Sequence, residues 1–454
     1  MPVSYESAVA NLLALGHELS SQRKFDLEQM RTLSLALGHP ERRIQSVLTA
    51  GTNGKGSTAA TLASIVQAAG YRTGLYTSPH LVRINERIQI NGEQISDVEF
   101  ALMYERVDSV AQRLVETGEL PWHPSFFEMV TAIMFEYFAS AGVDLAVLEV
   151  GLGGRLDATN ISDPSVCVIT DIDFDHQKFL GNTLPEITHE KAGIMRPRVP
   201  VVILPQHPQV NETLGREILE RNAQPVSAVE YMPPVTPDAE KLSGTTVLEG
   251  RNRFPLDVMG RQIMIDFPLA GRHQLRNLAL AIAAAEQLNQ VGLRILPEHI
   301  EQGVRNTRWP GRFEVLPAEA GQPEMIFDVA HNPAGAWALR SALSTFYGDR
   351  ALTFIFGAMK DKAIREIAEI LFPLAEHVVL THADSPRAAT AQEIAAIAAH
   401  TQAAIVEEPG IPLALEKARN LAGKNGVVVV TGSIYIVGAV QAQLASRAPM
   451  RQGV

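Results

Sequence analysis

The segment Gly51-Thr-Asn-Gly-Lys-Gly-Ser-Thr58 places the tightest constraint on how this chain folds. It lies between an apolar, strand-like run, Ile44–Ala50, and a helix-like run of small residues, Ser57–Ala69. Glycines let the backbone turn tightly and point its N–H groups at phosphate oxygens, and the following helix presents its N-terminus to the same anion. We therefore predict a loop that binds the phosphates of ATP and consists of Gly51, Thr52, Asn53, Gly54, Lys55, Gly56, Ser57 and Thr58.

One position of this loop departs from the standard nucleotide-binding pattern. Gly56 stands between Lys55 and Ser57, whereas GxxxxGK[ST] has the hydroxyl residue directly after the lysine. We still expect Lys55 to reach the β and γ phosphates, and Ser57 or Thr58 to reach a magnesium ion. A glycine-rich turn without a ligand is the alternative, and the strand–loop–helix context with a central lysine argues against it.

Strand-like and helix-like runs alternate along most of the chain, which favours an α/β fold with mainly parallel sheets. Between residues 206 and 268 this rhythm gives way to proline, glycine and short runs, which predict small strands and loops. The alternation restarts after a linker-like segment, Arg308–Arg312. We predict two α/β domains, residues 1–308 and residues 309–454.

The composition limits the classes of partner. The 454 residues carry a formal net charge of -11, so we expect no general binding to nucleic acid or to anionic membranes. No apolar run reaches the ~18 residues that a membrane-spanning helix needs. Cys167 is the single cysteine, which excludes an internal disulfide and is typical of a reducing compartment. We expect a cytoplasmic protein that acts on small molecules.

Further segments follow one another in an order typical of a known family. They read TSPHL (77–81), FFE (126–128), LEVGLGGRLDATN (148–160), DHQKFLG (175–181), HEKAGI (189–194), GRHQLRN (271–277), RWPGR (308–312), DVAHNP (328–333) and GSIY (432–435). With GTNGKGS they resemble the Mur ligase superfamily and, within it, the folylpolyglutamate synthases, in particular the bacterial bifunctional enzymes that also make dihydrofolate. The resemblance spans nearly the whole chain.

This resemblance implies a fold and a reaction. The N-terminal domain is expected to be a P-loop ATPase like the central domain of Mur ligases, the C-terminal domain to be Rossmann-like, and the active site to lie between them. ATP would phosphorylate a carboxylate of dihydropteroate or tetrahydrofolate, and the amine of L-glutamate would then attack the acyl-phosphate. The family is usually monomeric, so we expect a monomer.

The resemblance also implies two magnesium sites, formed by Ser57, Ser78, Glu149, His176 and Lys191. The residues agree in part, because Glu149 ends an apolar strand before a glycine turn, where α/β folds place ligands, and oxygen ligands suit magnesium. Lys191 is implied to be carbamylated by CO2, which would turn its ammonium into an anion. An unmodified surface lysine is the alternative.

Five positions match the pterin pocket of the bifunctional enzymes: Leu27, Ser125, Phe127, Asp157 and Ala158. The carboxylate of Asp157 could accept hydrogen bonds from the pterin amino and N–H groups, and Phe127 could stack on the ring. Ordinary core packing is the alternative for Phe127.

The C-terminal half is expected to complete the site. Asn277, Arg312, Asp328 and His331 match ATP-contacting positions, and a guanidinium at Arg312 could bind γ-phosphate oxygens as a fork. Helix capping is the alternative for Asp328, and Asn332 is itself a candidate cap. The expected catalytic residues are Lys55, His176, Lys191 and Arg312, and the expected contacts to the incoming glutamate are Lys360, His382, Ser385 and Ser433.

Three other functions are compatible with parts of the sequence. A monofunctional folylpolyglutamate synthase would lack only the dihydropteroate activity, and Phe127, Asp157 and Ala158 favour the bifunctional form. A ligase acting on UDP-linked peptides is disfavoured by TSPHL, FFE and GGRLDATN. A switch or transport ATPase would hydrolyse ATP without folate and glutamate, and the altered phosphate loop and the second α/β domain disfavour it.

Overall fold

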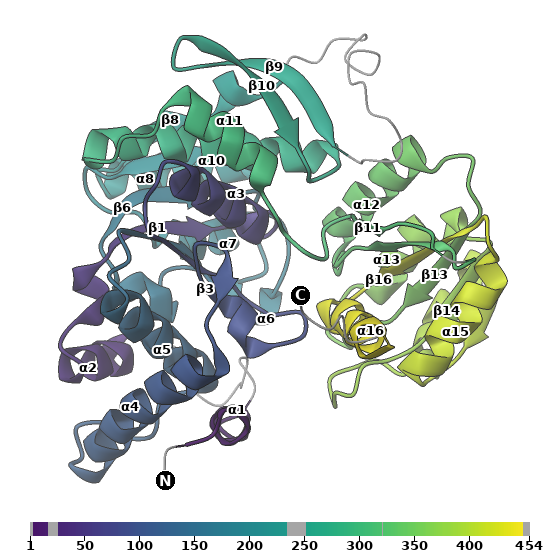
Figure 1. The fold of residues 1–454 in the computed structure, drawn as a ribbon, viewed down its shortest axis with the longest axis horizontal. Helices are drawn as coiled ribbons and strands as arrows, with labels where there is room; N and C mark the ends of the chain where they lie inside the picture. The colour runs from purple at the N-terminus through teal and green to yellow at the C-terminus, as the bar shows by residue number, and fades with distance from the viewer. Residues whose placement is uncertain (1–2, 17–25, 234–250, 320, 448–454) are drawn as a thin grey trace, which may run out of the picture.

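The computed structural model describes residues 3–16, 26–233, 251–319 and 321–447. Two sheets, each covered by helices, form an N-terminal and a C-terminal domain that lie side by side (Figure 1). The α/β fold predicted from the alternating pattern is confirmed.

An eight-stranded sheet, in the order β4-β3-β2-β5-β1-β6-β7-β8, forms the centre of the N-terminal domain. The strands are parallel except for β3 and β4, which are antiparallel at one edge. The strands are β1 (Gln45–Ala50), β2 (Thr73–Tyr76), β3 (Ile88–Ile90), β4 (Glu93–Gln94), β5 (Leu145–Glu149), β6 (Pro164–Ile169), β7 (Pro200–Ile203) and β8 (Gln224–Ser227).

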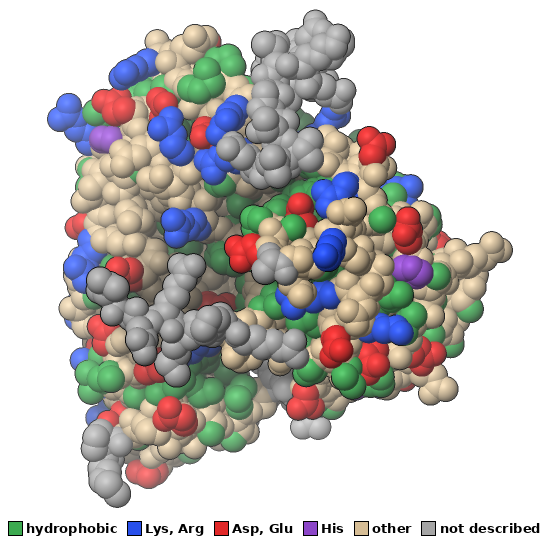
Figure 2. Space-filling view, turned by 45° about the vertical axis from the view of Figure 1, so that its right-hand side comes forward, with side chains coloured by type: hydrophobic (Ala, Val, Ile, Leu, Met, Phe, Trp, Pro, Cys, Tyr) green, Lys and Arg blue, Asp and Glu red, His purple; other side chains and the backbone are tan. Residues whose placement is uncertain are grey.

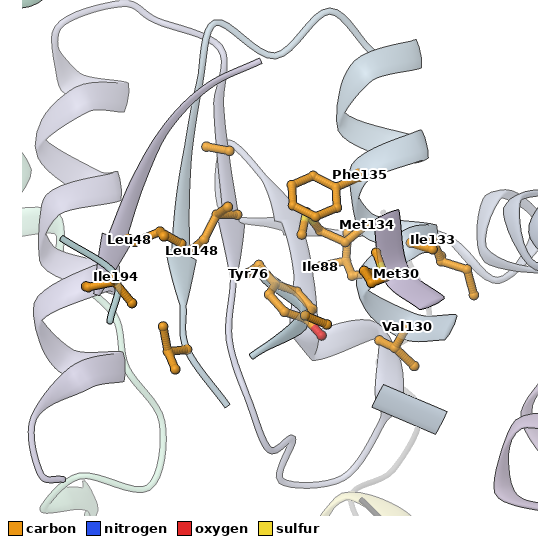
Figure 3. Packing of buried hydrophobic residues seen from close by; sticks show 14 of the residues in the cluster. Met30, Leu48, Tyr76, Ile88, Val130, Ile133, Met134, Phe135, Leu148 and Ile194 are labelled. Carbon is orange, nitrogen blue, oxygen red and sulfur yellow. The ribbon is translucent and has the colours of Figure 1, made fainter. Parts of the chain in front are cut away.

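Both faces of this sheet are buried, because successive side chains of a strand point to opposite faces. Val47 pairs with Val147 and packs under α3, α10 and α11, whereas Leu48 pairs with Leu148 and faces α4 and α5. Figure 3 shows Leu48 and Leu148 adjacent on the second face, with Tyr76 in the same cluster. Each such side chain stabilises the fold by about 1.5–3 kcal/mol when fully buried. The core thus fixes the strands whose ends carry the site.

Helix α3 directly follows the phosphate loop and is buried on nearly all sides, which explains its small residues. Helix α11 crosses it so closely that a Cβ on Gly303 would lie 2.4 Å from Ile65 Cα. The helices of this domain are α1 (Tyr5–Ala14), α2 (Glu28–Ala36), α3 (Lys55–Ala68), α4 (Asp97–Glu116), α5 (Phe126–Ser140), α6 (Gln177–Leu180), α7 (Leu184–Ala192), α8 (Pro208–Glu220), α10 (Arg272–Leu288) and α11 (Pro297–Asn306).

The region from 206 to 268 differs in part from its prediction. The antiparallel hairpin of β9 (Asn252–Val258) and β10 (Arg261–Phe267) fits the expected small strands. Helix α8 was not expected there, and its buried Val210, Leu214 and Ile218 recur at helical spacing. Pro208 at the first turn and Gly215 within the helix concealed this spacing in the sequence.

The C-terminal domain has a six-stranded sheet in the order β11-β12-β16-β13-β14-β15, parallel except for β11. Helices cover both faces, with Phe354 and Phe356 on one and Ile355 on the other. The elements are β11 (Glu314–Leu316), β12 (Glu324–Phe327), α12 (Pro333–Phe346), β13 (Leu352–Phe356), α13 (Ile364–Leu371), β14 (His377–Leu380), α14 (Ala391–Ala398), β15 (Ile405–Glu407), α15 (Ile411–Ala422), β16 (Val427–Thr431) and α16 (Ile434–Arg447).

The surface carries no single dominant charge on the face shown in Figure 2, where acidic and basic side chains are interspersed over both domains. Within the described ranges, no helix has both the length and the apolar character needed to cross a bilayer.

Candidate active site

A cavity of about 730 Å³ lies where the carboxyl ends of strands from both sheets meet. The loops after β1, β5 and β6 supply its N-terminal walls, and those after β12, β13 and β16 supply its C-terminal walls. Parallel α/β sheets place ligands at this end of their strands. The cavity therefore lies where a shared active site was predicted.

The phosphate loop owes its shape to two close contacts. Gly54 has φ +89°, and a Cβ there would lie 2.1 Å from Asn277 Oδ1. A Cβ on Gly51 would lie 1.8 Å from Thr170 Oγ1. Side chains at these positions would collide with buried neighbours, so the loop needs glycine for space as well as for backbone freedom.

The structure explains why glycine occupies position 56, where the loop departs from the standard motif. A Cβ at this position would lie 2.5 Å from Trp309 Cζ2 and 3.2 Å from Glu149 Oε2. Trp309 belongs to the RWPGR segment that leads into the C-terminal domain. Glycine at position 56 therefore lets the linker and the β5 carboxylate approach the loop.

Lys55 is the first residue of α3, and its side chain bonds back to the phosphate loop. Its Nζ donates to Thr52 O at 3.2 Å, while the N–H groups of Thr52 and Asn53 donate to Asp171 O at 2.8 and 3.1 Å. Asp171 is held in turn by the guanidinium of Arg276, through bonds to both carboxylate oxygens. Backbone hydrogen bonds thus attach the loop to Asp171 after β6, and the ion pair with Arg276 holds Asp171 in place.

Oxygen donors gather beside the loop. Glu149 is buried at the end of β5, and its Oε2 accepts from Ser78 N at 3.2 Å. Burial raises the pKa of Glu149, although the charges of Lys55, Arg312 and Arg87 act in the opposite direction. Among the described residues, no group of three or more His, Cys, Asp or Glu side chains is arranged to hold a metal ion by itself. A metal held here would therefore need hydroxyl or imidazole ligands beside the Glu149 carboxylate.

Lys191 reaches the underside of the phosphate loop from α7. Its Nζ donates to Gly51 O at 2.7 Å, and the side chain is buried. Burial lowers the pKa of Lys191 to about 7, and the charge of Lys55 acts in the same direction. The surface-lysine alternative is therefore wrong, and a sizeable fraction of this amine is neutral near pH 7.

His176 lies after β6 with φ +50°, at the start of the short helix α6. Burial lowers its pKa to about 4, although the neighbouring Asp175 opposes the shift. The imidazole is therefore neutral at pH 7 and has a lone pair available for a ligand.

The predicted ATP-contacting residues of the C-terminal half all line the cavity. Arg312 donates to Gly311 O at 3.1 Å, and burial lowers the pKa of its guanidinium against the charges of Asp328 and Glu149. Asp328 accepts from the N–H groups of Phe313 and Ala330, so it also fixes the turn after β12. These ATP-contacting residues are Asn277, Arg312, Asp328 and His331.

Asn332 caps helix α12, as the sequence suggested. Its Oδ1 accepts from Gly335 N at 2.8 Å. Its Nδ2 donates to Asn53 Oδ1 at 3.0 Å, which joins this cap directly to the phosphate loop. The contact between the two domains was not foreseen.

One part of the cavity is apolar and contains all five predicted pterin residues. Phe127 is half-buried beside Tyr76, with ring centroids 6.4 Å apart, and Gly151 is small enough to let the ring approach. Ser125 caps α5 in a reciprocal arrangement with Glu128. Leu27 and Ala158 are buried apolar wall residues.

Asp157, the fifth pterin candidate, is engaged within its own loop. One carboxylate oxygen accepts from the N–H groups of Gly151 and Leu152, and the other from the N–H and hydroxyl of Thr159. A carboxylate has about four acceptor positions, and all are used here. Asp157 therefore fixes the loop, and a pterin N–H would have to share one of these oxygens.

The four predicted glutamate contacts are not brought together. Ser433 lines the cavity, whereas Lys360, His382 and Ser385 do not. The Lys360 ammonium lies 3.5 Å from Glu393, and both side chains are about half exposed. Lys362 and Arg387, two cations of the same domain, do line the cavity.

Several cavity residues were not singled out from the sequence. His273, Asp175 and Arg155 lie inside quoted motifs, so a search for every titratable residue of those motifs would have found them. Lys362 and Arg387 have no comparable local signal. Only the folded arrangement brings them to the cavity.

Comparisons with known proteins agree with this geometry. The model of the Mur ligase middle domain matches residues 125–285, and that of the Mur ligase glutamate ligase domain matches residues 311–434. The dihydrofolate synthase/folylpolyglutamate synthase of Bacillus subtilis is 34% identical over 421 residues, which cover 92% of this chain and 94% of the relative. The chain belongs to the dihydrofolate synthase/folylpolyglutamate synthase family of Mur ligases.

Solved structures of this family share the whole fold. The folylpolyglutamate synthase of Mycobacterium tuberculosis complexed with ADP has a TM-score of 0.83 at 32% identity, covering 98% of this chain and 100% of its own. FolC of Escherichia coli in complex with DHPP and ADP has a TM-score of 0.79 at 28% identity, covering 97% and 98%. The family predicted from the order of motifs is confirmed.

Proposed function

We propose that this chain joins L-glutamate to dihydropteroate, forming dihydrofolate, and to tetrahydrofolate, forming polyglutamates. The observation that supports this most is that one cavity connects a phosphate loop to an apolar, aromatic-lined pocket. The chain is an ATP-dependent ligase, as its family membership and both ligase domains indicate. Its solved relatives include one complexed with ADP and one complexed with DHPP and ADP. In this proposal the nucleotide binds at the phosphate loop and the pterin binds in the apolar part of the cavity.

The reaction has two steps in this proposal. A carboxylate oxygen of the acid attacks the γ-phosphorus of ATP, ADP leaves, and an acyl-phosphate forms. The glutamate amine then attacks the carbonyl carbon, inorganic phosphate leaves, and the amine loses a proton as the amide forms. The first step brings two anions together, so charge neutralisation is the main catalytic requirement. We assign that work to Lys55 and Arg312, with the phosphate-loop N–H groups and with Asn277, Asp328 and His331 holding the nucleotide.

The residues beside the loop fit a magnesium ion. Glu149 supplies a buried carboxylate, and among the described residues no partner bonds to the buried hydroxyl of Thr58. We propose that Ser57 or Thr58, together with Ser78, Glu149 and His176, holds magnesium, which when bound would neutralise phosphate charge. His176 binds through its neutral ring nitrogen in this proposal.

Lys191 fits the predicted carbamylation. A neutral amine adds to CO2 and loses a proton, and burial makes neutral Lys191 accessible near pH 7. The resulting carbamate would be an anion on the lower side of the phosphate loop. We propose that it serves the second magnesium site.

The remaining assignments concern substrates and organisation. We propose Leu27, Ser125, Phe127, Asp157 and Ala158 for the pterin, and Ser433 and the cavity-lining cation Arg387 for glutamate. Lys360, His382 and Ser385 do not line the cavity, so they are left out of this assignment. We place the domain boundary between residues 308 and 309. We further propose a cytoplasmic monomer that does not bind nucleic acid.

Product analysis tests the function. The protein is incubated with Mg-ATP, L-glutamate and either dihydropteroate or tetrahydrofolate, and products are followed by mass spectrometry. Glutamate addition to both acids supports the bifunctional assignment. Addition to tetrahydrofolate alone makes the chain a monofunctional synthase, and ATP turnover without addition to either contradicts the proposal.

A further inference from the structure

A carboxylate of the N-terminal domain binds two side chains of the C-terminal domain. Asp175, in the loop after β6, has Oδ1 2.7 Å from Lys362 Nζ and Oδ2 3.5 Å from His331 Nε2. Lys362 follows β13, and His331 follows β12. The three side chains therefore connect three loops from two sheets.

The environment of this cluster differs from that of an ordinary surface ion pair. The side chains of Asp175 and Lys362 are 12% and 11% exposed, so water and salt screen their attraction weakly. By contrast, the ion pair of Lys360 with Glu393, close by in the same domain, is about half exposed. Removing one partner of a largely buried pair leaves the other charge uncompensated, which is the costly case.

His331 is oriented to take part. Its Nδ1 lies 2.9 Å from Val329 O, and its Nε2 faces Asp175. Both ring nitrogens therefore face oxygen atoms, so the ring is held from two sides. The next residue, Asn332, bonds to Asn53 of the phosphate loop. The turn after β12 is thus attached to the N-terminal domain at two adjacent points.

We propose that Asp175 is a positioning residue for the ligase reaction, because it holds Lys362 and His331 against the N-terminal domain and so couples domain closure to assembly of the cavity. An acyl-phosphate must be shielded from water until the amine attacks, and closure of the two domains provides that shield. Without the Asp175 carboxylate, the largely buried Lys362 ammonium would lose the anion that lies 2.7 Å from it. The inference rests on the proposed function for its kinetic test only.

The test uses the full chain with Asp175→Asn, Lys362→Met, Lys362→Arg and the double variant Asp175→Asn/Lys362→Met. Each single neutral variant is expected to lower kcat by roughly 30-fold or more, and the double variant to lose little beyond either single one. Lys362→Arg should retain most of the activity because the charge remains. Lys417→Met, which removes an exposed lysine of α15, is the matched control and should keep the original kcat.

A second readout reports closure directly. Small-angle X-ray scattering with and without the ATP analogue AMPPCP should show compaction of the unmodified chain and of Lys417→Met, and a reduced compaction of Asp175→Asn and Lys362→Met. Unchanged compaction with a raised KM for glutamate alone would overturn the inference and make Lys362 a glutamate ligand. Additive losses in the double variant would also overturn it. If the unmodified chain adds no glutamate, the proposed function fails, and compaction alone still decides the inference.

Discussion

The two walls of the cavity are built in different ways. The phosphate-loop wall, residues 51–58, is one continuous segment whose shape follows from glycines packed against Thr170, Asn277 and Trp309. The C-terminal wall, formed by Arg312, Asp328, His331 and Lys362, comes from three separate loops held by ion pairs and backbone contacts. The first wall is therefore set by local sterics, and the second by charges that act across the domain interface.

Substitution of Gly54 gives the strongest test that local sterics shape the phosphate-loop wall. We expect Gly54→Ala to lower kcat/KM for ATP by about 1000-fold, because positive φ and the collision with Asn277 together cost about 4 kcal/mol. Steady-state kinetics and calorimetric titration with AMPPCP would measure it.

Gly70 offers a matched control, since it also has φ +89° but no atom lies within 4 Å of a Cβ built there. Gly70→Ala should lose stability through backbone strain and keep its affinity for nucleotide. If both variants bind AMPPCP normally, collision does not shape the loop.

Substitution of Arg312 tests the role of charge in the C-terminal wall. Arg312→Lys keeps the charge but loses the planar fork, so we expect kcat to fall by about 100-fold with a smaller change in KM for ATP. Rates under saturating substrates and thermal unfolding would be compared. A kcat within about twofold of the original would mean that charge alone suffices at this position.

Lys191 contacts the phosphate-loop wall at Gly51, but its proposed carbamylation depends on the electrostatic lowering of its pKa. Its pKa is lowered to about 7, so the neutral amine increases as pH rises through that value. For protein freed of CO2, we expect activation at a fixed concentration of dissolved CO2 to be about tenfold faster one pH unit above 7 than one unit below it. Lys191→Ala should show no activation. A rate independent of pH across this range would contradict carbamylation of a neutral Lys191.

Substitution of Phe127 should give the smallest kinetic effect, because this side chain carries no charge and has no proposed contact with phosphate. Phe127→Leu keeps an apolar side chain and loses the aromatic face, worth about 0.5–1.5 kcal/mol. We expect KM for dihydropteroate to rise about fivefold while KM for ATP stays constant. Equal changes in both constants would indicate a general packing defect.

The contrast between the walls also explains what the sequence could predict. The phosphate loop, the strand that ends at Glu149 and the cap at Asn332 depend on neighbouring residues, so local patterns indicated them. Lys362 and Arg387 reach the cavity only because β13 and β14 adjoin in the C-terminal sheet, a tertiary fact with no local signal. Helix α8 was missed because Pro208 and Gly215 obscured its apolar spacing.

The central claim is that both walls act on one acyl-phosphate. Dihydropteroate carrying heavy oxygen in its carboxylate would be incubated with Mg-ATP, L-glutamate and the protein, and the released phosphate analysed by mass spectrometry. We predict that each phosphate carries one oxygen from the carboxylate, because that oxygen leaves with phosphorus when the amine attacks. Unlabelled phosphate accompanying labelled product would contradict the acyl-phosphate and the account built on this cavity.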